Sequence, residues 1–150
     1  MKRLFPIIMA LVLGIGLTAC SNGNGSQYAG KYTGTFKFIK DSTTKEGSVR
    51  ITNNPLSADG VLLYAVLPLN NVSTGKYSAS SENVEYMTQV LEAIFGNSNY
   101  IDAASETVKN IKVDATFSGN SLEMVVYYEV EMLSGLINSE VRIVEFNGTK

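Results

Sequence analysis

The side chains of this chain that could do acid–base chemistry are mainly carboxylates, because the sequence contains no histidine. The lack of histidine excludes the common general base, the Ser-His-Asp triad and most zinc and iron sites. Glu123, Glu129 and Glu131 share one face of a predicted strand, and a pair of carboxylates that flanks a cleft is what a glycosidase needs. Glutamates that alternate with an apolar face are typical of a solvated sheet surface, so we predict no catalytic residue among them.

Calcium binding is the other chemistry open to carboxylates. Asp41, Glu46 and Asp59 lie near predicted turns, but they lack the Asp-x-Asp-x-Asp-Gly spacing of calcium loops. No GxxxxGK[ST] phosphate loop occurs in the chain. The sequence therefore predicts no metal site, no cofactor and no enzyme activity.

The single cysteine, Cys20, directly follows an apolar run. Two cations precede this run over 4–17, and a helix of that length would span about 21 Å, short of the roughly 30 Å hydrocarbon core of a bilayer. A cationic start, a short apolar region and small residues are the signature of a secretory signal peptide. The last four residues, Leu17-Thr18-Ala19-Cys20, resemble a bacterial lipobox, in which the chain is cut before the cysteine and the thiol is lipidated. We therefore expect residues 1–19 to be a lipoprotein signal peptide and Cys20 to be the lipidation site.

Cleavage at this point would change the charge and the thiol chemistry of the chain. Loss of Lys2 and Arg3 takes the formal net charge from −2 to −4, and no basic run occurs, which argues against nucleic-acid binding and against electrostatic docking on anionic lipid. With Cys20 lipidated, no disulfide can form. Residues 20–27 are then expected to be the lipidated cysteine and a flexible tether, followed by a single domain over 28–150.

From Tyr28 onward the dominant sequence period is two, which is typical of half-buried strands. The stretch GKYTGTFKF predicts a first strand, DSTTKEG (41–47) predicts a turn, and SVRIT predicts the return strand of a hairpin. The run VLLYAVLPL (61–69) is continuously apolar up to its proline, which predicts one strand buried on both faces.

The C-terminal part shows the same alternation. A turn in which Gly119 supplies a positive φ is expected to join strands over 109–117 and 122–132. A final strand is expected over 140–147, with Val141 pointing inward.

The middle of the chain carries one helical pattern. Apolar side chains recur there at spacings of three and four, at Val84, Met87, Leu91 and Ile94. Ser80 or Ser81 can cap the helix, and Gly96 follows its end. We therefore expect a helix over 82–95 whose apolar stripe packs against the sheet.

About six or seven strands and one helix predict a β-rich α+β fold, in which an antiparallel sheet curls into a small barrel or half-barrel with the helix packed against it. A lipobox, a polar tether and an opening strand of the YAGKYTGTF type resemble small Bacteroidetes lipoproteins that carry a calycin-like or lipocalin-like domain. This resemblance covers the N-terminal third and the strand rhythm, and the helix over 82–95 departs from a simple up-and-down barrel. That group has no assigned catalytic residues, so the resemblance implies none.

Binding is the function class that remains. Eight tyrosines without tryptophan suit a glycan or peptide ligand, although their dispersion along the chain favours core positions. We expect an outer-membrane lipoprotein that binds a small apolar ligand, a glycan or an envelope protein without catalysis. The resemblance implies the periplasmic face, because no acidic residue directly follows Cys20. The alternatives are a carboxylate-dependent hydrolase and a structural or inhibitor-like module that uses an exposed strand edge.

Overall fold

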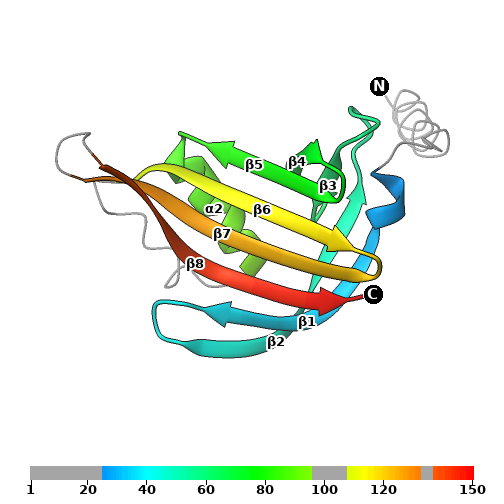
Figure 1. Ribbon diagram of the computed structural model, residues 1–150, viewed down its shortest axis with the longest axis horizontal. Coiled ribbons are helices and arrows are strands. Elements are labelled where there is room, and N and C mark those ends of the chain that lie inside the picture. The colour runs from blue at the N-terminus through cyan, green and yellow to red at the C-terminus, as the bar shows by residue number, and fades with distance from the viewer. Residues whose placement is uncertain (1–24, 96–107, 133–136) are drawn as a thin grey trace, which may run out of the picture.

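The computed structural model describes residues 25–95, 108–132 and 137–150 of the chain (Figure 1). A short 3₁₀ helix, η1 (Ser26–Tyr28), leads into eight strands and the helix α2 (Val84–Phe95). The strands are β1 (Gly30–Phe38), β2 (Thr43–Asn53), β3 (Val61–Leu63), β4 (Leu67–Ser73), β5 (Lys76–Ser81), β6 (Val108–Ser118), β7 (Ser121–Met132) and β8 (Ile137–Thr149). No helix in this described part of the chain is long and apolar enough to cross a bilayer.

The strands form a closed antiparallel barrel. Each strand pairs with its neighbour in sequence, and β8 returns to pair with β1. The predicted β-rich fold with one helix is therefore confirmed, and the sheet closes instead of remaining a half-barrel. The barrel has eight strands, where six or seven were expected.

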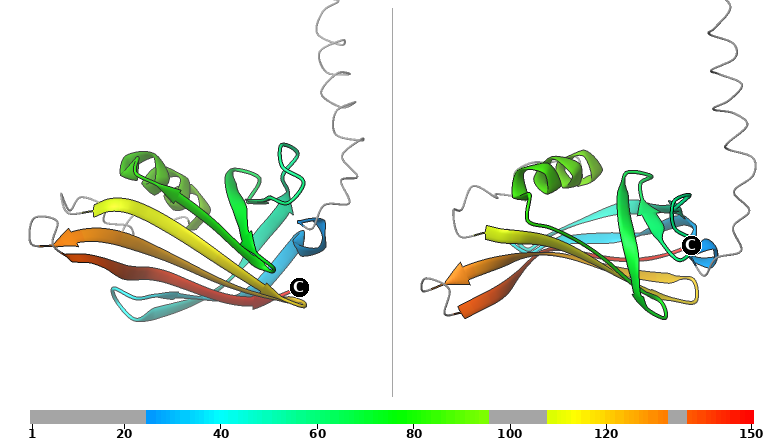
Figure 2. Two further views of the ribbon diagram at one scale, coloured as in Figure 1. Left: turned by 45° about the horizontal axis from the view of Figure 1, so that its top comes forward. Right: turned by 90° about the horizontal axis from the view of Figure 1, so that it is seen from above.

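The two ends of the barrel differ, and we name each after the helix that it carries. The η1 end holds η1, the β2–β3 loop (54–60), the tight turns before β5 and β7, and Lys150 (Figure 1, Figure 2). There the Lys150 ammonium donates to the carbonyl oxygens of Gln27 at 2.7 Å and Ala29 at 3.1 Å. The α2 end lies opposite and holds α2 and the β1–β2 turn (Figure 2).

The additional strand comes from the apolar run over 61–69, where the prediction of one strand buried on both faces is wrong. Tyr64 and Ala65 have positive φ values of 51° and 59°, so the run splits into a hairpin of β3 and β4. Val61 and Leu63 are buried, and the residue between them is partly exposed, as in an ordinary half-buried strand. Positive φ is rare for residues other than glycine, which is why the sequence does not reveal this turn.

The first hairpin has a shorter turn than the sequence suggests. The Asp41 carboxylate accepts hydrogen bonds from the Thr43 backbone N–H at 3.0 Å and from its hydroxyl at 2.6 Å. These bonds limit the turn to residues 39–42. β2 therefore begins at Thr43 rather than at Ser48. Glu46, expected in the turn, pairs with Thr35 of β1.

Aromatic side chains close the barrel interior at the η1 end. Tyr28 stacks on Phe117 with ring centroids 4.5 Å apart, and Tyr77 meets both rings edge-on. The Tyr32 hydroxyl donates to the Tyr28 carbonyl oxygen at 2.9 Å. The core position expected for most tyrosines is confirmed for these three, and η1 is part of the folded domain rather than of a tether.

α2 covers the barrel interior at the opposite end, as the right-hand view of Figure 2 shows. Its buried side chains are Met87, Val90 and Leu91. The remaining members of the predicted stripe, Val84 and Ile94, pack against the same core. The packing of this stripe against the sheet is therefore confirmed.

The cap of α2 differs from the prediction. The Asn83 side-chain oxygen accepts a hydrogen bond from the Tyr86 backbone N–H at 3.0 Å, so Asn83 is the N-cap in place of Ser80 or Ser81. The helix accordingly begins at Val84, two residues later than expected. Gly96, the expected helix stop, lies outside the described residues.

The pairing of β8 with β7 contains an irregularity that the sequence pattern does not reveal. The register shifts between Val126 and Tyr127, and Ile143 and Val144 are consecutive buried residues of β8. Such a bulge reverses the inside–outside alternation beyond it. Val141 is consequently 47% exposed, and the prediction that it points inward is wrong.

Two glycines have clear steric roles. Gly34 of β1 pairs with Gly148 of β8, and a Cβ on Gly34 would lie 1.9 Å from the Asn147 carbonyl oxygen. Barrel closure therefore requires a glycine at position 34. Gly119 has a φ of 57° in the two-residue turn between β6 and β7, which confirms the predicted turn.

Candidate functional site

The three glutamates singled out from the sequence do not converge. Glu123 lies at the η1 end of β7, whereas Glu129 and Glu131 lie roughly 20 Å and 26 Å farther along the strand, at about 3.3 Å per residue. The Glu129 carboxylate accepts a hydrogen bond from the Asn110 amide at 2.8 Å, and Glu131 forms an ion pair with Lys109 at 3.0 Å. These contacts fit the expected solvated sheet face.

The acidic residues considered for calcium are also apart. Asp41 holds the β1–β2 turn, Glu46 accepts a hydrogen bond from the Thr35 hydroxyl at 2.9 Å, and Asp59 lies in the β2–β3 loop. Within the described ranges, no three His, Cys, Asp or Glu side chains are grouped closely enough to hold a metal ion.

The sequence contains two Ser-x-x-Lys tetrapeptides, Ser42–Lys45 and Ser73–Lys76. Each belongs to a hairpin rather than to a helix, and both the serine and the lysine of each are exposed. A nucleophile of this type needs a lysine whose pKa is lowered by burial or by a neighbouring cation. Neither tetrapeptide offers a buried lysine.

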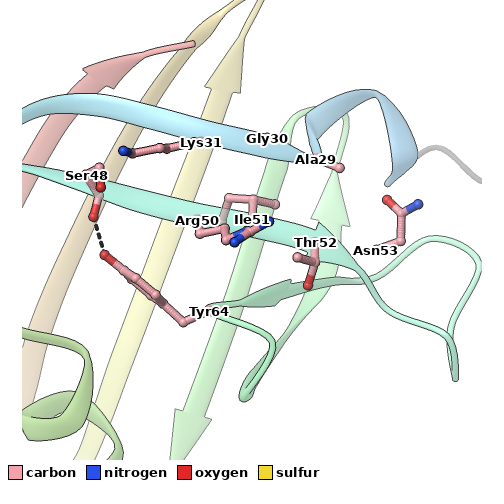
Figure 3. A pocket seen from close by; sticks show the side chains of 9 residues that line it. All are labelled: Ala29, Gly30, Lys31, Ser48, Arg50, Ile51, Thr52, Asn53 and Tyr64. Atoms are coloured by element: carbon pink, nitrogen blue, oxygen red, sulfur yellow. Dashed lines mark hydrogen bonds between the residues drawn. The ribbon is translucent and has the colours of Figure 1, made fainter. Parts of the chain in front are cut away.

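A pocket of about 840 Å³ lies on the β1–β2 side of the barrel and reaches the η1 end (Figure 3). Its lining comprises residues 29–31 where η1 leads into β1, residues 48 and 50–53 of β2, and Tyr64 after β3. None of these lining residues is acidic. We call this feature the cationic pocket, because its charged side chains are Lys31 and Arg50.

Lys31 and Arg50 are direct cross-strand partners in the β1–β2 register, and both are exposed. Neither has a carboxylate within 4.0 Å among the described residues. Lys37, farther along the same strand, does pair with Glu145 at 3.8 Å. Like charges placed directly opposite each other destabilise a sheet, so a bound anion between them would remove a repulsion.

Hydrogen-bonding groups complete the cationic pocket. The Tyr64 hydroxyl donates to the Ser48 carbonyl oxygen, and the Tyr64 backbone N–H donates to the Arg50 carbonyl oxygen at 2.8 Å (Figure 3). Burial raises the pKa of the Tyr64 hydroxyl. Thr52 Oγ1 and Asn53 Oδ1 are buried and have no hydrogen-bond partner within the described structure.

The charged groups of this pocket are hydrogen-bond donors that suit an anion. Arg50 offers a planar guanidinium that suits carboxylate or phosphate oxygens, and Lys31 adds a second positive charge. The lining holds no carboxylate, thiol or imidazole that could act as a general base. The arrangement therefore fits an anionic group held between two cations.

Sequence reasoning missed this pair because the two cations lie nineteen positions apart and no basic run contains them. The signal that could have revealed them is the hairpin register. Once the β1–β2 turn is confined to the residues around Asp41, Lys31 and Arg50 must lie opposite each other.

Cys20 and residues 1–19 lie outside the described residues, so lipidation and cleavage stay predictions. Comparisons of the chain with protein-family models, with curated proteins and with solved structures found no match.

Proposed function

We propose that this protein is a lipid-anchored envelope protein whose barrel is a non-enzymatic binding module for an anionic group. The anchor is Cys20, supported by the apolar run and the lipobox-like Leu17–Cys20 sequence. The binding site is the cationic pocket. Its location would be the outer membrane, on the periplasmic face.

The observation that carries this proposal is the Lys31–Arg50 pair. In an acidic protein these two cations face each other across a hairpin, without a carboxylate partner among the described residues. They line a pocket that also contains hydroxyl and amide groups. Charge-assisted hydrogen bonds to such a pair are stronger than those between neutral groups.

A titration of the barrel with anionic probes tests this function. Inorganic phosphate and a uronic-acid oligosaccharide are suitable probes, followed by isothermal calorimetry and by amide NMR shifts around β1 and β2. We expect Lys31→Ala and Arg50→Ala each to weaken binding roughly tenfold or more, since a hydrogen bond to a charged group contributes about 1.5–3 kcal/mol.

Lys37→Ala is the matched control for this titration. Lys37 lies on the same face of β1 but already pairs with Glu145, so its removal should leave affinity unchanged. Equal affinities for the parent and all three variants, or shifts that map away from β2, would contradict the assignment.

A further inference from the structure

The charges of the barrel are unevenly distributed between its two ends. The cations near the η1 end, Lys31, Arg50, Lys76 and Lys150, outnumber its acids, Asp59 and Glu123. Over the rest of the described structure acidic side chains are in excess, and three of them, Glu82, Glu85 and Glu92, lie in or beside α2. The fold thus gathers positive charge at one end of an acidic protein, although the sequence has no basic run, so the expectation from sequence that the protein does not dock electrostatically on anionic lipid does not hold for this end.

The chain between the proposed anchor and the barrel is short. Gly25 is buried, and an ideal Cβ on it would lie 2.6 Å from the Gly60 carbonyl oxygen, so the chain enters the barrel against the β2–β3 loop. Only residues 21–24 separate Cys20 from Gly25. Even fully extended, this connection spans at most about 18 Å, from about 3.6 Å per residue.

The same loop carries the most exposed large apolar side chain among the described residues. Leu56, at the tip of the β2–β3 loop, is 94% exposed. Its backbone N–H donates to the Asn54 side-chain oxygen at 3.0 Å, and the Ser57 N–H donates to the Asn54 carbonyl oxygen at 3.2 Å. An ordered loop thus presents a leucine to the surroundings, next to the point where the chain leaves toward Cys20.

We propose that the η1 end lies against the bilayer, with Leu56 inserted at the headgroup level and the cationic pocket facing the phosphates of anionic lipid. This inference rests on the lipid anchor proposed above and names lipid headgroups as the anionic partner. Three independent features agree with it: the short connection to Cys20, the positive charge of the η1 end and the apolar tip of the β2–β3 loop. Basic residues near an anionic leaflet are attracted to it, and an apolar tip adds burial in the interface.

Site-specific labelling of the full-length, processed protein in vesicles tests this orientation. Lipidation converts the Cys20 thiol to a thioether, so Leu56→Cys introduces a single reactive thiol for a polarity-sensitive fluorophore. Tyr86→Cys is the matched control, because Tyr86 is also exposed, at 52%, and lies on α2 at the opposite end of the barrel. Mass spectrometry of the mature N-terminus first establishes whether Cys20 carries lipid.

In vesicles of phosphatidylethanolamine and phosphatidylglycerol, we expect a blue-shifted emission at position 56 that brominated acyl chains quench several-fold more than the emission at position 86. Lys31→Ala combined with Arg50→Ala should reduce this quenching in the anionic vesicles but not in vesicles of phosphatidylcholine alone.

The outcomes separate the two proposals. Unmodified Cys20 would overturn the anchor. A lipidated protein whose labels at 56 and 86 are quenched equally would overturn the orientation while leaving the anchor intact. A blue shift at position 56 that also occurs in detergent without vesicles, and rises with protein concentration, would identify a second copy as the occupant and overturn the lipid assignment.

Discussion

Phe36 of β1 and Phe95 of α2 meet edge to face, with ring centroids 5.5 Å apart and an interplanar angle of 76°. This contact joins the last turn of the helix to the barrel wall. Together with the buried Met87 and Leu91 and the packing of Val84, it shows that α2 contacts the core from its first residue to its last. The helix therefore belongs to the core of the fold.

Removing the centre of this packing should destabilise the protein. Leu91 is fully buried, and Leu91→Ala should lower the free energy of unfolding by about 2–5 kcal/mol, because it removes apolar contacts and leaves a cavity. Gln89→Ala, at an exposed position of the same helix, is the control and should change stability little. Urea denaturation measures the unfolding midpoints of both variants and of the parent. A midpoint of Leu91→Ala equal to that of the parent would mean that α2 is a loosely attached lid.

Barrel closure should be sensitive to one methyl group at position 34. Gly34→Ala places a Cβ 1.9 Å from the Asn147 carbonyl oxygen, so β1 and β8 must separate. We expect a loss at or above the upper end of the roughly 1–3 kcal/mol typical of overpacking. Gly119→Ala has open space around its Cβ and should lose only about 1–2 kcal/mol through its positive φ. Thermal unfolding that ranks Gly119→Ala as the more damaging change would contradict this view of closure.

The repulsion in the cationic pocket predicts opposite effects on stability and on binding. Lys31→Glu would place a carboxylate opposite Arg50 and should raise the free energy of unfolding by about 0.2–1 kcal/mol. The same variant should lose binding of inorganic phosphate. Chemical denaturation and calorimetry on one preparation measure the two effects, and unchanged stability would show that the cations do not interact.

The raised pKa of Tyr127 predicts that the protein loses stability at alkaline pH. Burial, followed by the hydrogen bond that its hydroxyl donates to Asp114, raises the pKa of Tyr127 above the unfolded value near 10. The contribution of Tyr127 is therefore complete below pH 10 and is lost as the pH rises above it, with a slope of up to about 1.4 kcal/mol per pH unit. Tyr127→Phe should reduce this slope without abolishing it, because burial also raises the pKa values of Tyr32 and Tyr77. Identical profiles of the free energy of unfolding against pH for the parent and for Tyr127→Phe would contradict this role of Tyr127.

Replacement of Cys20 tests whether this residue is the lipid anchor. Cys20→Ala should leave the precursor uncut at this position and without lipid, because the thiol is the group to be modified. Metabolic labelling with a fatty acid, followed by fractionation of the envelope, measures both properties. Lipid incorporation that persists in Cys20→Ala would rule out Cys20 as the anchor.

Local patterns predicted much of the fold. The stripe at Met87 and Leu91 indicated a buried helix face, and Gly119 indicated a turn, because each depends on neighbours close in sequence. The hairpin at Tyr64 and Ala65 was missed, since it places ordinary side chains at positive φ. The outward position of Val141 was also missed, because the bulge depends on pairing with β7.

The candidate site was harder to predict than the fold. Its polar character comes from Lys31 and Arg50, which become neighbours only through strand register. Tyr64 joins them because of a turn that propensity does not reveal. A site assembled from single residues of three elements leaves no motif in the sequence.

The bond from the Lys150 ammonium to the Gln27 carbonyl oxygen has a practical consequence for protein engineering. This bond holds Lys150, the residue after β8, beside η1. The first and last parts of the described barrel therefore lie at the same end. A short linker could join them, and a circular permutant opened at the Gly119 turn should keep every strand pair. A reporter fused after Lys150 would instead lie at the η1 end, where the described chain begins, so an internal fusion at the β1–β2 turn is the better design.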